Sequence, residues 1–251
     1  MMEIVTFPDS LSPTIAWGFV FLSFFTSLLT ASFGLGGGAV LLAVMAQTMP
    51  VTALIPVHGA VQTGSNLGRA LIMWPDVRWD LLRWFLLGSL VGALIGGNLV
   101  ISLPKDLLRG LLGAFILFSV WGASWRIDNI NRPLLSGGGF FTTFLSMFVG
   151  VAGPLVVAFI RAFGLSSVGL VATTAACMAS QHILKIVIFS LLGFAFAPYF
   201  PLIGLMIVSG FFGTLAGRKI LLKIDQKKFS FILNIILTVL ALRLIFTAVL
   251  D

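Results

Sequence analysis

Apolar runs follow one another along almost the whole chain, and each is long enough to cross a lipid bilayer. About 20 helical residues span a hydrocarbon core. Hydrophobic residues make up 59% of the 251 residues and charged residues 9%, whereas soluble domains carry about 25% charged residues. A soluble fold of this size could not cover so much apolar surface with polar side chains. The sequence therefore predicts an integral membrane protein.

Short polar or proline-marked breaks divide the apolar runs into eight expected spans. These spans are residues 14–33, 51–73, 81–102, 107–125, 135–160, 166–190, 200–222 and 229–249. We therefore expect an all-α fold, a polytopic transmembrane bundle of about eight helices in the cell (inner) membrane.

Glycine-rich segments interrupt two of the apolar runs. Residues 34–38 read GLGGG and residues 150–154 read GVAGP. The apolar sequence continues beyond each segment, and the first run is too long for a single crossing at about 1.5 Å per residue. We expect an unwound point followed by a short half-helix at both places.

The two breaks belong to a weak internal repeat. A shift of 116 residues lays the first break on the second and Arg69 on Lys185. Two four-helix halves, residues 1–126 and 127–251, are the simplest account within one membrane domain. With an even number of crossings each, the halves are expected to point the same way, unless a broken helix fails to cross.

Small residues indicate where helices pack closely in lipid. Gly88, Gly92 and Gly96 recur every four residues, and Gly213 with Gly217 repeats the pattern in the second half. This spacing lets two helix backbones approach each other.

The basic residues predict the orientation in the membrane. One expected side carries Lys105, Arg109, Arg161, Arg218, Lys219, Lys223, Lys227 and Lys228. The other carries Arg78, Arg83, Arg126 and Arg132, diluted by Asp76, Asp80 and Asp128. Cytoplasmic loops are enriched in Lys and Arg, so the first side is predicted to be cytoplasmic and both termini extracytoplasmic.

The charged residues and the single cysteine argue against nucleic-acid binding, metal or cofactor binding and enzymatic activity. The net charge of +7 comes from residues at helix ends and forms no dense patch, so we expect no nucleic-acid partner. The single Cys177 and the absence of a Cys/His cluster predict neither a metal site nor another cofactor. All eight acidic residues fall in termini or loops, so paired carboxylates for catalysis are missing and we expect no enzyme.

The ionisable residues within the expected spans are basic. Arg69 lies in the second span, and His182 and Lys185 share a face of the sixth. Asn66 and Gln181 add hydrogen-bonding groups nearby. A cation near the bilayer centre costs about 2.5–3.5 kcal/mol, so these positions predict a donor-rich cavity for an anion. The alternatives are that Arg69 and Lys185 reach the head groups and that His182 makes a structural hydrogen bond; His58 is interpreted as structural.

The glycine breaks supply a second kind of donor. A helix that restarts inside the bilayer exposes backbone N–H groups, and its dipole favours an anion at that end. Gly36, Gly37 and Gly38 allow close approach, and Pro154 after Gly153 suits the first turn of a helix. The alternative is a simple kink. The candidate substrate-binding residues are Gly36, Gly37, Gly38, Asn66, Arg69, Gly153, Pro154, Gln181, His182 and Lys185.

Seven short segments carry a resemblance to a known family. They are SFGLGGGAV from Ser32, DVRW from Asp76, GALIGGNL from Gly92, LPKDLLRGLLG from Leu103, GVAGP from Gly150, QHILK from Gln181 and FFGTLAGRK from Phe211. In this order they resemble the sulfite exporter TauE/SafE family of small-anion permeases, over roughly residues 31–246. The resemblance implies a tandem four-helix repeat and points to both glycine breaks, His182 and Lys185. The chain departs from the family pattern in the second half, where GxGGG is reduced to GVAGP.

We hypothesise a secondary transporter that exports a small anion, such as sulfite, a sulfonate or a related organic acid, by alternating access between the halves. A passive anion channel and a membrane enzyme or assembly factor of sulfur metabolism are the alternatives. The expected partners are the anionic substrate and the lipid bilayer, and a homodimer is left open.

Overall fold

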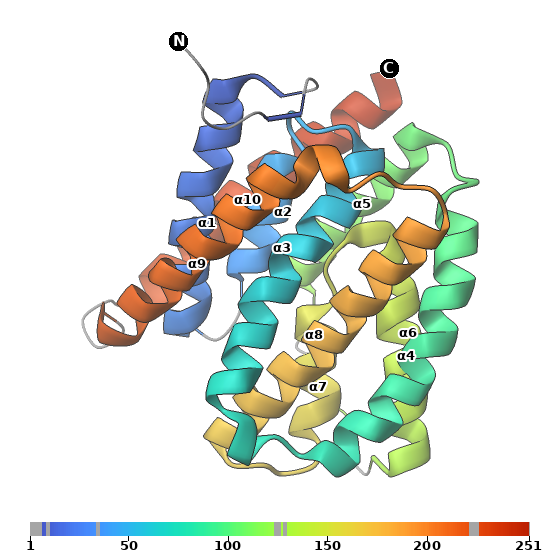
Figure 1. Ribbon diagram of the computed structural model, residues 1–251, viewed down its shortest axis with the longest axis vertical. Helices are drawn as coiled ribbons and strands as arrows, with labels where there is room; N and C mark the ends of the chain where they lie inside the picture. Colours follow the sequence, from blue (N-terminus) through green and yellow to red (C-terminus); the bar gives the residue numbers. More distant parts are fainter. Residues whose placement is uncertain are drawn as a thin grey trace.

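The computed structural model describes residues 7–8, 11–33, 36–122, 127, 130–220 and 226–250. Within them the regular structure is helical throughout (Figure 1). The α-helices are α1 Pro13–Phe33, α2 Gly37–Met45, α3 Val51–Ile72, α4 Trp79–Val100, α5 Lys105–Trp121, α6 Arg132–Val149, α7 Gly153–Arg161, α8 Ser167–Leu191, α9 Phe200–Ile220 and α10 Gln226–Leu250. Two short 3-10 helices, Trp74–Asp76 and Ala197–Tyr199, precede α4 and α9.

Five helices of the described part, α1, α4, α8, α9 and α10, are long and apolar enough to cross a membrane. Large apolar side chains cover the outside of the bundle: Phe21 is 66% exposed and Leu191 is 77% exposed. Such a surface requires lipid around it. The prediction of an all-α membrane bundle is confirmed at this level, and the number of eight crossings stays a prediction.

The half-helices expected after the glycine breaks are present as α2 and α7, each nine residues long. At about 1.5 Å per residue, such a helix covers roughly half of a bilayer core. Gly150 ends α6 with a φ of 73°, a left-handed conformation that a side chain would strain. The chain then turns and restarts as α7 at Gly153.

Glycine lets two pairs of helices touch along their backbones, as the sequence predicted. A Cβ atom at Gly88 or Gly92 would overlap a carbonyl oxygen of α6, and one at Gly213 would overlap the carbonyl oxygen of Phe24 in α1. Along both pairs the contacts advance in the same direction. Therefore α4 packs parallel to α6, and α1 packs parallel to α9.

The central pair of helices, α3 and α8, packs antiparallel. The ring of His58, in the first half of α3, lies beside that of His182, in the second half of α8. At the other end of the pair, the N–H of Arg78, just beyond α3, donates to Thr173 near the start of α8. Helices α5 and α10 are antiparallel as well, because Gly113 lies against Ile245 while Trp121 donates to Thr238.

These directions differ from the expectation that the two halves point the same way. In Figure 1, α1 and α3 run from the upper to the lower end of the bundle, whereas α4, α6 and α8 run upward. The reason is that α2 turns back between α1 and α3, so the broken segment does not cross to the far side. If the two halves are repeats, they are related by inversion, the case expected for a broken helix that fails to cross.

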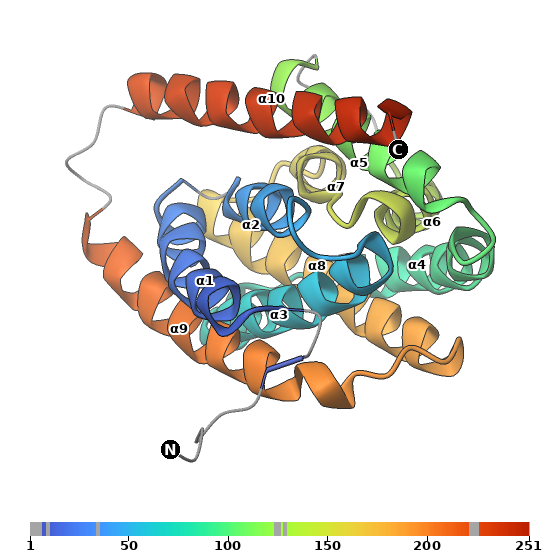
Figure 2. The same cartoon turned by 90° about the horizontal axis from the view of Figure 1, so that it is seen from above.

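Seen from above, α3 and α8 occupy the middle of the bundle (Figure 2). The pair α1 and α9 lies on one side, α4 and α6 lie on another, and α10 lies beside α5 at the periphery. The short helices α2 and α7 are inside this ring, where most of their side chains are buried. The two helix restarts therefore lie in the protein interior.

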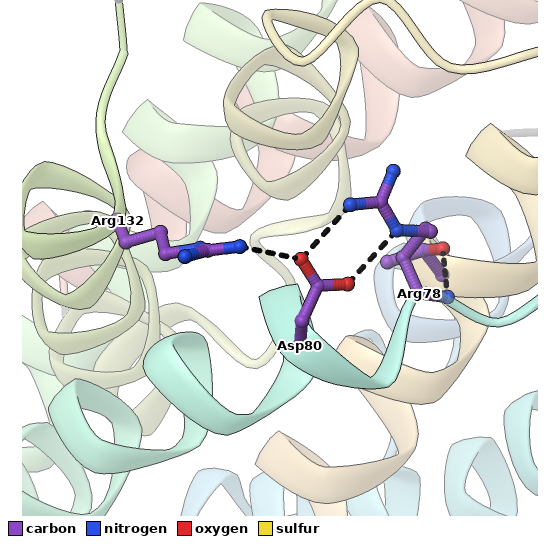
Figure 3. A network of polar contacts seen from close by, with 4 residues as sticks. Arg78, Asp80 and Arg132 are labelled. Atoms are coloured by element: carbon purple, nitrogen blue, oxygen red, sulfur yellow. Dashed lines mark hydrogen bonds and ion pairs between the residues drawn. The ribbon is translucent and has the colours of Figure 1, made fainter.

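One polar network joins the starts of α4 and α6 (Figure 3). Asp80 accepts from Arg78 Nε at 2.8 Å and from Arg132 at 3.3 Å. The hydrogen bond and then the charge of Asp80 raise the pKa of Arg78. All three side chains are at least a third exposed, so each pair contributes about 0–1 kcal/mol to stability.

Candidate functional site

A cavity of about 60 Å³ lies between α2, α3, α5, α8 and the start of α7. A single water needs about 10–15 Å³ of such space, so the cavity accommodates a few waters or one small anion. No carboxylate is among its lining residues in the described part of the chain.

Both helix restarts open on this cavity. Gly36 and Gly38 at the start of α2 line it, and so do Gly153 and Pro154 at the start of α7. Neither start has a side-chain cap, and Gly36 has a φ of 102°. The first N–H groups of a helix have no partner within that helix and favour an anion. Because Pro154 has no N–H, α7 offers fewer donors than α2.

One face of α3 forms the polar wall of the cavity. His58, Gln62, Asn66 and Arg69 follow one another at helical spacing, and all four line it. His58 Nε2 lies 3.0 Å from the carbonyl oxygen of Gly38, and the Gln62 amide nitrogen lies 3.3 Å from the same ring nitrogen. Asn66 donates to the Gln62 carbonyl at 2.9 Å. These contacts fix the polar face of α3 against the start of α2.

Arg69 is the charged residue of that face. Its terminal nitrogen donates to Ser65 at 3.4 Å, but its Nε is buried and has no hydrogen-bond partner in the described structure. A buried donor without a partner costs about 1–3 kcal/mol. The guanidinium fork matches an oxyanion, which could accept from Nε and a terminal nitrogen at once.

Three of the predicted binding residues lie on α8, and each has a different position relative to the cavity. His182 lines the cavity, and its ring centre is 6.3 Å from that of His58. Lys185 is completely buried behind the cavity, and its Nζ donates to the Gly150 carbonyl at 3.0 Å. It therefore does not reach the head groups. Gln181 is turned toward α6, where it donates to two threonines.

The structure thus brings seven of the ten candidate residues to one cavity: Gly36, Gly38, Asn66, Arg69, Gly153, Pro154 and His182. Gln181 and Lys185 support it from behind, and Gly37 lines a smaller neighbouring pocket. Whether these residues bind a substrate stays a prediction.

A comparison with family models identifies the group of proteins to which this chain is related. The model described as Sulfite exporter TauE/SafE matches residues 19–244, which is most of the chain and includes every residue of the cavity. The chain belongs to the sulfite exporter TauE/SafE family. No curated protein and no solved structure matches it.

Membership in the TauE/SafE family, together with the apolar helices, makes this chain an integral membrane transport protein of a family that exports sulfite. The TauE/SafE assignment is the one that the sequence motifs indicated, and it confirms that prediction. It describes a transporter family, consistent with the expectation that the chain is no enzyme.

Two side chains that line the cavity of this TauE/SafE protein were not among the binding residues predicted from the sequence. His58 was interpreted as structural, and Gln62 was not among the candidates, yet both line the cavity. Their spacing of four residues from each other, and of Gln62 from Asn66, was the available signal. The wall contributed by α5, including Ser119, had no such signal because the contact of α5 with the cavity depends on the tertiary fold.

A second, smaller pocket adjoins the cavity on the side of α1 and α9. Its volume is about 10 Å³, enough for one water. Hydroxyl groups surround it, namely those of Ser23, Thr26, Ser27, Thr30 and Ser65. Thr30, Gly38 and Gln62 line both spaces, so the polar lining is continuous between them.

Proposed function

We propose that this TauE/SafE protein carries a small oxyanion, such as sulfite, a sulfonate or a related organic acid, through the cavity between the starts of α2 and α7. One observation carries the proposal. Arg69, with its buried and unpartnered Nε, shares the cavity with two uncapped helix starts and with no lining carboxylate of the described part. Such a set of donors complements an oxyanion and discriminates against a cation.

The transport mechanism we propose is alternating access between the two halves, residues 1–126 and 127–251. The starts of α2 and α7 are 116 positions apart in the sequence, and both helices lead away from the cavity. From there, α2 leads back toward the end where α3 starts, and α7 leads toward the end where α8 starts. Because α3 and α8 are antiparallel, these are opposite ends of the bundle. Inverted repeats with broken helices at the midplane fit a carrier that opens alternately to each side.

We further propose that the end of the bundle bearing Arg78 and Arg132 is cytoplasmic, in the cell (inner) membrane. These residues lie at the starts of α4 and α6, and the last turn of α7 adds Arg161. Lys105 belongs to the opposite end, because α4 runs the whole length between them. This grouping differs from the one predicted from eight alternating crossings, but it also leaves both termini extracytoplasmic. For an anion that moves without a coupled ion, export is then favoured by about 2.3 kcal/mol per charge per 100 mV of negative-inside potential.

Flux measurements with purified protein in proteoliposomes test the proposal. We expect labelled sulfite or methanesulfonate to leave the vesicles, and Arg69→Gln to lower the rate by roughly tenfold or more, since a hydrogen bond to a charged group contributes about 1.5–3 kcal/mol. Arg161→Gln, an exposed arginine in the last turn of α7, is the matched control and should keep the wild-type rate. Equal rates for all three proteins would refute the site.

The same vesicles distinguish a carrier from a channel. In a carrier, unlabelled anion on the opposite side of the membrane accelerates the flux of labelled anion. The reason is that the anion-loaded protein changes its open side faster than the empty protein. A passive channel gives no such acceleration.

A further inference from the structure

Two imidazole rings meet at the wall of the cavity. The chain contains two histidines, and both are here: His58 on α3 and His182 on α8. Their ring centres are 6.3 Å apart, His58 is fully buried and His182 is 4% exposed. Histidine is the side chain that most readily gains and loses a proton near neutral pH. Both such groups of this chain therefore face the anion cavity.

The hydrogen bonds leave room for an additional proton on this pair. The Gly38 carbonyl can only accept, so its 3.0 Å contact requires the hydrogen of the His58 ring on Nε2, and the Gln62 amide nitrogen 3.3 Å away then makes no hydrogen bond to this ring nitrogen. A neutral imidazole has one hydrogen, so Nδ1 of His58 carries a free lone pair. This Nδ1 is buried and has no hydrogen-bond partner in the described structure, and the same holds for Nδ1 of His182. Each ring thus keeps a buried ring nitrogen that no protein group satisfies.

The charges around the pair are positive. Lys185 is one turn beyond His182 on α8, with its stem packed against Gly59 next to His58, whereas Arg69 lies eleven residues, about 16 Å, farther along α3. Among the described lining residues, α2, α5, α6 and α7 contribute no titratable side chain to the cavity. A proton added to either ring is repelled by the nearby ammonium group of Lys185 while the cavity is empty. An anion in the cavity compensates for that repulsion.

We propose that the His58–His182 pair binds a proton together with the transported anion, so that the protein is a proton-coupled anion carrier. This inference rests on the proposed function. By thermodynamic linkage, an anion that favours protonation of the pair is itself bound more tightly by the protonated pair. The proton resides on a ring nitrogen, and it leaves when the anion leaves. One proton with one monoanion is electroneutral, so the flux follows the gradients of anion and proton instead of the membrane voltage.

Proton uptake on binding tests the inference. Methanesulfonate is the probe, because its own charge is constant between pH 5 and 8, the range in which an ordinary histidine titrates. We expect the purified wild-type protein to take up as much as one proton per bound anion, measured by calorimetry in two buffers of different ionisation enthalpy. The double variant His58→Gln, His182→Gln should take up none. Ser102→Ala, at an exposed serine outside the cavity, should match the wild type in protons per anion.

A second measurement uses the wild-type protein alone, in case the double variant does not fold. In proteoliposomes a potassium diffusion potential should leave methanesulfonate flux unchanged, whereas a pH gradient should accumulate the anion about tenfold per pH unit. Binding without proton uptake, or a flux driven by voltage alone, overturns the coupling and leaves the proposed function intact. Uptake that persists in the double variant overturns the assignment to this pair. Absence of any methanesulfonate or sulfite binding overturns the proposed function itself, and the coupling with it.

Discussion

The ammonium group of Lys185 donates a hydrogen bond to the carbonyl oxygen of Gly150, with 3.0 Å between Nζ and oxygen. Gly150 is the residue at which α6 ends before the chain restarts as α7. Helix α8 therefore holds the second helix break in place from inside the protein. The cation is completely buried, and no carboxylate of the described residues pairs with it.

Lys185→Met removes this tether while keeping most of the stem volume. The Gly150 carbonyl loses a partner, which costs about 1–3 kcal/mol, but the protein no longer buries an ammonium group. We expect a melting temperature within a few degrees of the wild type and a transport rate reduced roughly tenfold, because the start of α7 is no longer positioned. Detergent-solubilised melting curves and vesicle flux measure both quantities. Lys105→Met, at an exposed lysine, is the control, and an unchanged rate in Lys185→Met would contradict a role for the tether.

Adding a single methyl group at the contact between α4 and α6 is expected to lower the free energy of unfolding strongly. A Cβ at Gly88 would overlap backbone atoms of Ser136 and Phe140, so Gly88→Ala must push the two helices apart. We expect a loss of about 1–3 kcal/mol in the free energy of unfolding, seen as a lower melting temperature. Gly137→Ala, on an exposed position of α6 with open space around it, should be neutral or stabilising by up to about 1 kcal/mol. Similar losses for both variants would show that the backbone contact is not the cause.

Removing the Arg78–Asp80–Arg132 network is expected to lower the free energy of unfolding only slightly. Asp80→Asn removes both ion pairs, but the three side chains are substantially exposed. We expect the free energy of unfolding to fall by no more than about 1–2 kcal/mol, and the loss to shrink at high salt. Chemical denaturation at two salt concentrations is the measurement. A loss that is large and independent of salt would mean that the network supports the α4–α6 contact in another way.

Cysteine labelling can report on the cavity, because the native chain contains one cysteine. Cys177 is buried and free, so it should react slowly with water-soluble thiol reagents. In a Cys177→Ala background, Ser119→Cys places a thiol at the cavity wall and Ser102→Cys places one on the exposed surface. We expect methanesulfonate, added without sulfite, to slow labelling at position 119 several-fold and to leave labelling at position 102 unaffected, as measured by mass spectrometry. Equal protection at both positions would exclude occupancy of the cavity as the reason.

Much of the fold could be predicted from the sequence, because the length of an apolar run sets the length of a membrane helix. The span expected at 51–73 is α3 Val51–Ile72, and the span expected at 200–222 is α9 Phe200–Ile220. The two short helices after the glycine breaks were also predicted. The direction of α2 was not, since nine apolar residues are compatible with continuing across the membrane or turning back.

The residue types of the candidate site could be predicted from the sequence, but the positions of their side chains could not. The sequence identified Arg69, His182 and Lys185 as basic residues within the bilayer. It left open whether Arg69 and Lys185 face a cavity or reach the head groups, and whether His182 makes a structural hydrogen bond. Lys185 is directed inward because Gly59 on α3 has no side chain, so the lysine stem can pack against that helix. This contact depends on the pairing of α3 with α8, which no local pattern encodes. The opposite directions of α3 and α8 were likewise not predicted, because an even number of expected crossings implied that the two halves point the same way.

We propose that an anion occupies the space between Arg69 and the starts of α2 and α7. Selenite, a close analogue of sulfite with a strong anomalous signal, tests this directly in crystals of the purified protein. We expect one anomalous peak in the cavity, within hydrogen-bonding distance of the Arg69 side chain and of backbone N–H groups in the first turn of α2. A peak at the outer surface alone, or an empty cavity at a selenite concentration that saturates transport, would contradict it.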